Sequence, residues 1–566
     1  MLVDTANGAS VQNIPPATGP IKRVIRSLAG ALKSNAEQEL PTHGRRVFVI
    51  TQYIISSLLL CYAIFAPHSI ALTQGAYLLG MGAWAVQFAA TRRLNQKRSA
   101  VDIALFGFFA CCVVSSFLSY DPLVSIKGLK SPAFFFVFYF VSNRIRTLRF
   151  AFLLAVTLVL SCLVNVAYSA VTLSVGRGLQ IESITPDSAF ANEAIAVGDT
   201  IIEADDQPVN SRGDILRIID SQRGRLRLKL QRKEALIETS IPRQAIKDSG
   251  GVGFERLGIT TSPGRNFRIT GFYSHYETYA EVLQLIAALA LGLLIAVPNK
   301  RSGLAWFLSA AIPLILLALI LTSTRAAVAG LSLSVAVMAV AHSKRRVLIV
   351  VMIAVIILLP LGMFAIERSR GISLFDPEEG STAYRLEVWR EALRIIKDNP
   401  VVGIGKGSEA KLKEQLGLYN DGRLPPGHFH STPVQIAVWW GLVALIFYGS
   451  FMTVFTIEIW RFIRGSSSFN QWQVRGIALG GLGTLVAFNV SSFAHFNFGD
   501  GEVVMALWLL TGLAFAVRRI DSESRDSSQS AEAQPPPSQD NSNKNLLQQP
   551  ATISEPTVQA AKAKQN

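Results

Sequence analysis

The chain has 566 residues, of which 50% are hydrophobic and only 16% are charged, and its mean hydropathy is +0.35. A soluble protein of this length carries more charge and less apolar surface, so the composition excludes an ordinary soluble protein. The formal net charge is +15 at pH 7. Because the basic residues gather between apolar segments, we interpret this charge as a sign of membrane topology and not of nucleic-acid binding.

Apolar blocks of about 15 to 26 residues recur along the chain, close to the length that a helix needs to cross about 30 Å of hydrocarbon. Only helices and closed barrels satisfy their backbone polar groups in that environment. The pattern predicts an all-α polytopic membrane protein with about 12 transmembrane helices, the first five in 45–175 and the others in 244–518. The predicted spans are approximately 48–66, 69–90, 101–119, 124–141, 150–175, 279–297, 304–322, 326–341, 347–366, 433–457, 476–494 and 503–517.

Lysines and arginines precede the first predicted span and follow every second one. Because such residues stay on the cytoplasmic side, we expect both termini in the cytoplasm and the protein in a bacterial inner (cytoplasmic) membrane. The segments 1–44 and 519–566 are polar and poor in aromatic residues, so they are predicted to be disordered cytoplasmic arms.

Between the fifth and sixth predicted spans the pattern changes to short alternating runs, which are typical of strands. Gly178-Leu-Gln-Ile181 opens an apolar strand, and Val197-Gly-Asp-Thr-Ile-Ile202 gives another. Residues 214–222 have helical spacing, and residues 226–232 alternate as a closing strand should. This order resembles a PDZ domain, and the resemblance covers 176–243.

The resemblance implies a small α+β domain on the periplasmic side. By strand addition, such a domain accepts an extended peptide or a C-terminus, here near Leu179, Ile181 and Ile215. A domain that only shapes or gates the periplasmic face is the alternative.

Three segments on the predicted periplasmic side place arginine beside apolar spans, where charge is costly unless it is paired or functional. Arg268 precedes the sixth span, and Arg325 lies between the seventh and eighth. Arg385 lies in the large loop 367–432, on an expected amphipathic helix, four residues before Trp389 and therefore on the same face. We predict that these arginines bind an anion; interfacial or snorkelling arginines are the alternative.

The same loop contains the glycine-rich run 402–407, whose flexible backbone amides are expected to approach an anion, although the run lacks the Walker spacing. The loop closes with His428 and His430 at the mouth of the tenth span. Histidine titrates near neutrality and suits a general base that acts on an alcohol. A purely structural histidine, or His428 acting in place of His430, is the alternative.

No residue pattern predicts a metal site or a bound cofactor. The four cysteines all lie inside predicted spans, and the chain contains no Cys-x-x-Cys, Asp-x-Asp or His-Glu-x-x-His sequence.

The second half of the chain, 268–508, resembles the O-antigen ligase and polymerase superfamily. The ligase pattern of histidine, a polar residue and a glycine after nine further residues is met by His430, Ser431 and Gly441, whereas Ala444 differs at its last place. Thr-Ser-Thr-Arg325 is similar to the Ser-Arg signature of the family. Tyr384-Arg385, followed by Trp389, resembles the stretch that leads to its catalytic histidine.

This resemblance implies a fold similar to the GT-C class of membrane glycosyltransferases and a metal-independent transfer of glycan from undecaprenyl diphosphate. Catalytic roles then fall to His430 as the base and to Arg325 and Arg385 at the diphosphate, with substrate contacts from Arg268, Trp389, His428 and Gly441. Permanently charged, planar guanidinium groups suit a diphosphate.

The implied acceptor is lipid A-core, a glycan or a protein. An O-antigen ligase, a polymerase of lipid-linked repeats and a protein O-oligosaccharyltransferase therefore all remain open. From another class, a transporter or flippase with a regulatory PDZ module is the alternative. Such a protein places ionisable residues near the bilayer midplane and often shows internal repeats, and neither feature is evident in this chain.

Overall fold

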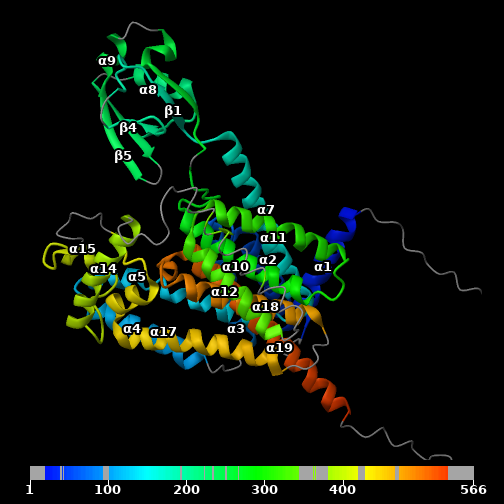
Figure 1. Ribbon diagram of the computed structural model, residues 1–566. Coiled ribbons are helices and arrows are strands. Elements are labelled where there is room, and N and C mark those ends of the chain that lie inside the picture. The colour runs from blue at the N-terminus through cyan, green and yellow to red at the C-terminus, as the bar shows by residue number, and fades with distance from the viewer. Residues whose placement is uncertain are drawn as a thin grey trace, which may run out of the picture. The chain divides into compact units, whose positions relative to one another are not determined.

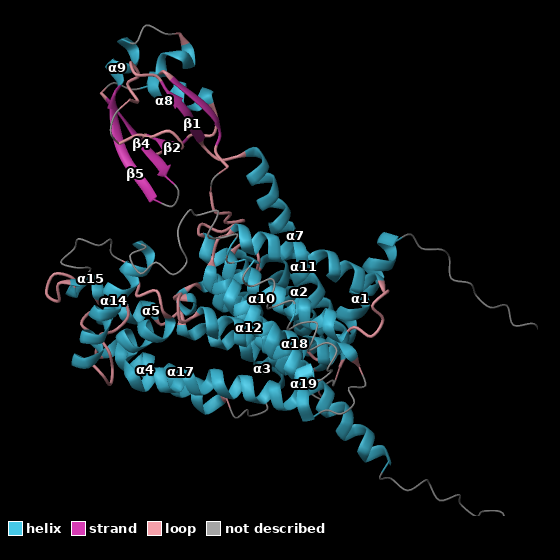
Figure 2. Ribbon diagram, in the orientation of Figure 1, coloured by secondary structure: helices cyan, strands magenta, loops and turns pink. Residues whose placement is uncertain are grey.

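The computed structural model describes residues 20–38, 41, 44–92, 101–191, 194–221, 224–232, 235–248, 252–265, 267–342, 353, 361–362, 364, 380–418, 427–465 and 471–532. Within these ranges the chain is mostly helical, apart from one antiparallel sheet (Figures 1 and 2). The chain divides into two units, Met1–Ile520 and Asp521–Asn566, and the contacts described below lie within the first.

Nine helical segments of the described residues are long and apolar enough to cross a membrane, so the chain is a multi-pass membrane protein. One of them, Pro122–Arg144, is broken at Pro132 into α5 (Pro122–Gly128), the short helix η1 (Pro132–Phe135) and α6 (Phe136–Arg144). The others are α2 (Arg45–Phe65), α7 (Leu148–Val175), α10 (Tyr276–Ala296), α11 (Gly303–Leu321), α12 (Arg325–His342), α17 (Thr432–Gly465), α18 (Trp472–Ser491) and the first part of α19 (Gly501–Glu532).

These nine segments coincide with nine of the twelve predicted spans. The second and third predicted spans form α3 (Ile70–Thr91) and α4 (Asp102–Phe117). Helix α4 has only 16 residues, and glycines, threonines and two glutamines dilute the apolar residues of α3. Almost all of the predicted span 347–366 lies outside the described residues. A total of twelve spans therefore stays a prediction.

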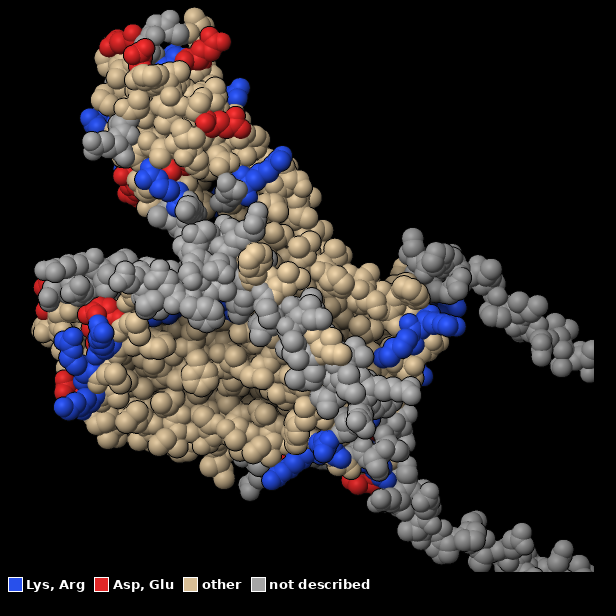
Figure 3. Space-filling view, viewed as in Figure 1, with Lys and Arg blue, Asp and Glu red and all other residues tan. Residues whose placement is uncertain are grey.

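A broad uncharged surface covers α4 and α17, with charged side chains gathered toward α14 at one end and basic side chains at the other (Figure 3). The exposed apolar side chains of these two helices include Phe106, Val114, Leu442 and Ile446. An apolar surface of this kind is stable against lipid and not against water.

Helix α1 (Pro20–Glu37) lies inside the segment 1–44, for which the sequence predicts a disordered arm. The helix is held through Asn35, whose side chain donates to Ser56 Oγ at 2.9 Å and accepts from Arg146 N–H at 2.6 Å. Ala31 and Ala36 are also buried, and α1 packs against α2 and α7. This packing and the polar anchor together explain the difference, because composition alone shows neither. Helix α19 likewise continues beyond residue 519, where the predicted tail begins.

Helices α10, α12 and α18 pack against one another and position the site. A Cβ on Gly330 of α12 would lie 2.7 Å from Ala487 O of α18 and 2.8 Å from Gln284 Oε1 of α10. This close approach brings the start of α10, the start of α12 and the end of α18 to the same end of the bundle. Three further helices complete this end of the fold: α14 (Gly380–Asp398), α15 (Glu409–Leu412) and η3 (Asn497–Gly499).

Between α7 and α10 the chain forms an antiparallel sheet with its own apolar core, in the order β5-β4-β2-β1-β6 with β3 beside β2. The sheet extends beyond the predicted limits of 176–243, because β6 follows them in the sequence. Its elements are β1 (Leu179–Ile184), β2 (Thr200–Ala204), β3 (Gln207–Pro208), α8 (Arg212–Ser221), β4 (Arg225–Arg232), β5 (Ala235–Pro242), α9 (Arg243–Asp248), η2 (Gly253–Leu257) and β6 (Ile259–Pro263).

The structure contradicts the predicted peptide site beside β1. Strand β1 pairs with β2 on one side and with β6 on the other, so neither of its edges can accept an added strand. Leu179, Ile181 and Ile215 are at most 5% exposed and belong to the core of this domain. The prediction missed β6, since residues 259–263 lie beyond the segment that resembles a PDZ domain.

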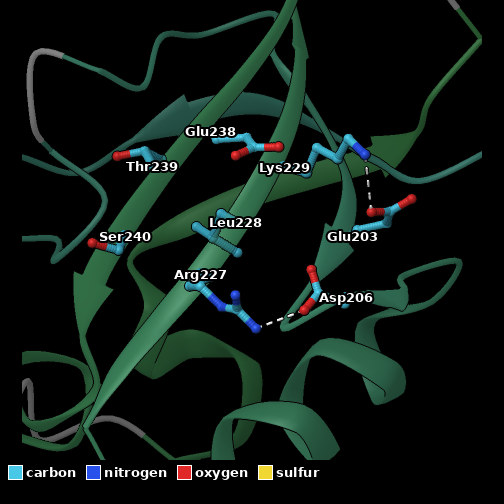
Figure 4. Close-up of a pocket in the computed structure, with 8 residues that line it drawn as sticks. All are labelled: Glu203, Asp206, Arg227, Leu228, Lys229, Glu238, Thr239 and Ser240. Carbon is cyan, nitrogen blue, oxygen red and sulfur yellow. Dashed lines mark hydrogen bonds and ion pairs between the residues drawn. The ribbon is translucent and has the colours of Figure 1, made fainter. Parts of the chain in front are cut away.

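A pocket of about 260 Å³ lies on the charged face of β2, β4 and β5 (Figure 4). Two ion pairs cross it, Arg227 with Asp206 at 2.6 Å and Lys229 with Glu203 at 3.4 Å. Such exposed pairs contribute little to stability, and nothing in this pocket points to chemistry.

Candidate functional site

The loop before α17 holds the two predicted histidines in a strained turn. His430 has a φ of 47°, a left-handed conformation that costs a non-glycine residue about 1–3 kcal/mol. Its backbone N–H donates to Nδ1 of His428 at 3.2 Å. Between them, Phe429 N–H donates to Gln435 Oε1 at 2.9 Å, and Phe429 O accepts from Trp389 Nε1 at 2.7 Å. The turn is therefore held from both α17 and α14.

A buried acid that the sequence analysis missed supports the same loop. Glu409 of α15 is 8% exposed and accepts hydrogen bonds from Gln435 Nε2 at 3.2 Å and from Trp439 Nε1. Burial raises the pKa of the Glu409 carboxyl. Because Glu409 fixes the amide group of Gln435, the amide oxygen faces the N–H of Phe429.

Aromatic and charged side chains surround His430. Its ring meets Tyr384 edge-on at 5.5 Å between centroids and lies 4.2 Å from the ring of His428. Burial and His428 lower the pKa of His430 to about 4; Arg385 acts in the same direction, and Glu277 opposes them. The imidazole is therefore neutral near pH 7 and able to accept a proton. Its Nδ1 is buried without a hydrogen-bond partner among the described residues.

A further histidine, His495, lies between two glutamates of α10. Its Nδ1 is 2.7 Å from Glu281 Oε1, and its Nε2 is 3.8 Å from Glu277 Oε1. Burial opposes protonation of His495, but Glu277 and the hydrogen bond with Glu281 outweigh it and raise its pKa. Glu281 is 2% exposed and also accepts from Ser491 Oγ at 2.8 Å and Asn497 Nδ2 at 3.2 Å. The two carboxylates thus favour the charged form of His495.

The His430 loop and the His495 group form one electrostatic site. Glu277 raises, and Arg385 lowers, the pKa of each of His428, His430 and His495. For His428, burial is the largest effect, and its pKa is lowered overall.

Of the bonded pair His495 and Glu281, only Glu281 could have been identified as a candidate from the sequence. Glu281 lies within the predicted span 279–297, and an acid inside an apolar span is usually functional. His495 gave no such signal, because it follows a span in a short polar segment and lies 214 residues from its partner Glu281.

A cavity of about 430 Å³ opens beside these groups. Helix α10 lines it with Glu277 and Glu281, the loop lines it with His428, and most of its other walls come from 495–502. Among the residues that the structure describes, no group of three or more His, Cys, Asp or Glu side chains could hold a metal ion.

The predicted arginines occupy three different places. Arg385 of α14 acts on the histidines directly through its charge. The guanidinium of Arg268 lies 4.1 Å from the ring centroid of Tyr276, the first residue of α10 and the neighbour of Glu277. Arg325 is the first residue of α12, at the end of the bundle where α10 begins. The structure thus brings Arg385, like Trp389 and His428, to His430, and it places the other two on neighbouring elements.

Gly441 has a structural reason for being glycine. It interrupts α17 with a φ of 83°, and a Cβ there would lie 2.0 Å from Val401 O. The interruption frees backbone groups of α17, and the segment after α14 supplies partners for them, beginning with Leu442 N–H, which donates to Pro400 O at 2.7 Å. We therefore assign Gly441 to the scaffold of the site and not to its substrate contacts.

The sequence predicts that the amides of the glycine run 402–407 approach an anion, but two of them instead bond to the interrupted helix α17. Ile404 N–H donates to Val438 O at 2.9 Å, and Gly405 N–H donates to Trp439 O at 2.8 Å. These amides are used within the protein because the broken helix leaves carbonyl groups that need donors.

A family model described as O-Antigen ligase matches residues 308–449. The matched segment contains Arg325, Arg385, Trp389, the two loop histidines and Gly441. The match supports the O-antigen ligase superfamily and with it a class of membrane enzyme, the lipid-linked glycan transferases. No curated protein matches the chain.

Proposed function

We propose that this protein is an inner-membrane glycosyltransferase that moves a polysaccharide or oligosaccharide from undecaprenyl diphosphate to an acceptor hydroxyl at the periplasmic face, without a metal ion. One observation carries the proposal: the segment that matches the O-antigen ligase family contains His430, a neutral imidazole held in a strained turn and facing the charge of Arg385.

Glycan transfer requires a base for the acceptor hydroxyl and cationic groups for the leaving diphosphate. The acceptor hydroxyl gives its proton to His430 as its oxygen bonds to the anomeric carbon. The bond from that carbon to the diphosphate breaks, and the diphosphate keeps the electron pair. Arg385, together with Arg325 and Arg268 from neighbouring elements, stabilises the developing negative charge.

A bound diphosphate also makes His430 a better base. Burial and Arg385 lower the pKa of His430 in the empty site, and an anion beside it favours the charged imidazolium. The pKa therefore rises toward neutrality when the donor binds, which is where a general base works best.

The topology of the proposal follows from the basic residues of the sequence. With both termini in the cytoplasm, the starts of α10 and α12 and the loop before α17 lie on the periplasmic side. A lipid-linked glycan can be used there only after it has crossed the membrane.

The proposal is tested by reconstituting the purified protein in liposomes with undecaprenyl-diphosphate glycan and one of three acceptors: lipid A-core glycolipid, a lipid-linked repeat unit or an acceptor protein. We expect a larger glycolipid, a longer glycan or a glycoprotein, and the product identifies the acceptor class. Donor that stays intact with all three acceptors would contradict the proposal.

A further inference from the structure

The cavity beside His495 differs in the charge of its lining from the part of the site around Arg385, which we call the arginine side. Four carboxylates line it, from Glu277, Glu281, Asp500 and Glu502. Thr278 Oγ1 donates to Asp500, and Glu502 N–H donates to Asp500 Oδ1 at 3.2 Å, so the wall formed by the start of α19 is tied to α10. Hydrogen bonds therefore fix two walls of this cavity, whose volume is about 430 Å³.

Glu277 and Asp500, on opposite walls, make this cavity unfavourable for a diphosphate. Like charges at short range repel, and ionised carboxylates accept hydrogen bonds but cannot donate them. Such a lining favours a ligand whose bound part is uncharged and carries several hydrogen-bond donors. The hydroxyl groups of a sugar ring meet this requirement.

The position of Glu277 is set by the two residues behind it. Glu281 accepts from Ser491 and Asn497 and holds Nδ1 of His495 at 2.7 Å, which leaves Nε2 facing Glu277 at 3.8 Å. The Glu277 side chain is 19% exposed, against 2% for Glu281. Of the linked residues Glu281, His495 and Glu277, Glu277 is therefore the most accessible from the cavity, and its charge also acts on His430.

We propose that this cavity is the acceptor subsite, that it takes a sugar with free hydroxyl groups, and that Glu277 accepts a hydrogen bond from one of those hydroxyls beside His430. This inference rests on the proposed function. His495 and Glu281 are positioning residues that act through Glu277. The donor diphosphate then stays on the arginine side and the acceptor on the carboxylate side.

The test measures donor binding and acceptor use separately. Undecaprenyl diphosphate binding is followed by native mass spectrometry, and transfer is followed with lipid A-core glycolipid and, in parallel, with a lipid-linked repeat unit as acceptor. Glu277→Gln and, from the other wall, Asp500→Asn are each expected to raise the KM for the acceptor about tenfold or more, because a hydrogen bond to a charged group is lost. Donor affinity is expected to stay within about twofold of wild type, which also shows that the variants are folded.

Glu387→Gln is the matched control. Its carboxylate pairs with Arg390 at 2.9 Å on α14, and its side chain is 33% exposed. We expect its acceptor KM and donor affinity to equal those of the wild type.

The positioning role is tested with His495→Gln, alone and combined with Glu277→Gln. If His495 acts through Glu277, the double variant has the acceptor KM of Glu277→Gln alone; multiplied effects would contradict that role.

The outcomes separate the two proposals. An unchanged acceptor KM in both Glu277→Gln and Asp500→Asn, with an active wild type, overturns the acceptor subsite and leaves the proposed function standing. A wild type that transfers glycan only to a protein hydroxyl also overturns it. A wild type that neither binds undecaprenyl diphosphate nor transfers glycan overturns both.

Discussion

His430 is half-buried and His495 is buried, and the charges of Glu277 and Arg385 act on both, yet their pKa values shift in opposite directions. His430 lies in a loop beside another histidine, and burial lowers its pKa to about 4. His495 makes a 2.7 Å hydrogen bond with a buried carboxylate, and its pKa is raised. In this site the hydrogen-bonded partner, and not burial alone, therefore decides the charge of a histidine. The neutral histidine suits proton transfer, and the charged one suits holding carboxylates in place.

The largest effect on the transfer rate is expected from His430→Gln, which removes the neutral histidine that we propose as the base. Loss of a general base lowers the rate by about 10²- to 10⁴-fold. The measurement is the initial rate of glycan transfer in proteoliposomes at equal protein insertion. His68→Gln is the control, since His68 bonds to Ser161 at 2.7 Å and does not line the cavity of the site. Equal rates for His430→Gln and wild type would remove His430 from the mechanism.

Arg385→Ala should lower transfer by about 10- to 100-fold, because one charge-assisted contact with the diphosphate is lost. The same change should raise the pKa of His430, since Arg385 opposes its protonation. Histidine-selective NMR titration of the empty protein measures that shift. Arg390→Ala, on the same helix with a 72% exposed side chain, should change neither quantity. A His430 pKa that is the same with and without Arg385 would contradict the electrostatic site.

Gly441→Ala tests the scaffold beneath the loop. The added Cβ meets Val401 O at 2.0 Å in a backbone conformation with φ of 83°, so we expect a loss of about 1–3 kcal/mol of stability and a lower transfer rate. Gly449→Ala in the same helix has no atom within 4 Å of the new Cβ and should be neutral or slightly stabilising. Thermal unfolding in detergent compares the two. Equal melting temperatures would show that the interruption of α17 is not required.

The smallest effect concerns stability against pH, and its sign should differ between the two histidines. The pKa of His430 is lower in the folded chain than the ordinary value of about 6.5, so wild type loses stability as pH falls from about 6.5 toward 4, and His430→Gln escapes that loss. The pKa of His495 is raised, so its contribution is complete below about 6.5 and disappears as pH rises through the folded value.

The His495→Gln variant should therefore be most destabilised relative to wild type at low pH. For each histidine the slope is at most about 1.4 kcal/mol per pH unit. Melting temperatures from pH about 5 to 8 measure it. The same sign for both variants would break the comparison.

The two sides of the site also differ in how far the sequence predicted them. His430, Arg385 and Trp389 can be predicted as candidates because a short spacing and a helical period carry them. Gly441 was found by its spacing, but the sequence could not show that a backbone carbonyl lies where its side chain would be. The pairing of His495 with Glu281 joins residues 214 apart, and only the packing of α10 against α18 brings them together.

The same limit explains the error in the sheet domain. Alternation predicted strands within 176–243, and the structure contains them, but β6 comes from beyond those limits and covers the edge of β1. Hydropathy likewise predicted the apolar helices well, because crossing a membrane constrains length and composition strongly. It missed α1, which is too polar to span a membrane but packs against α2 and α7 and is anchored through Asn35.

The most direct test of the central claim follows both products of wild-type protein in proteoliposomes that contain undecaprenyl-diphosphate glycan and a hydroxyl acceptor, with a chelator present. We expect glycan to appear on the acceptor and free undecaprenyl diphosphate to appear in equal amount, at a rate that the chelator does not lower. Lipid-linked glycan that reaches the other leaflet with its diphosphate bond intact, and without any product on the acceptor, would contradict a glycosyltransferase and favour a flippase.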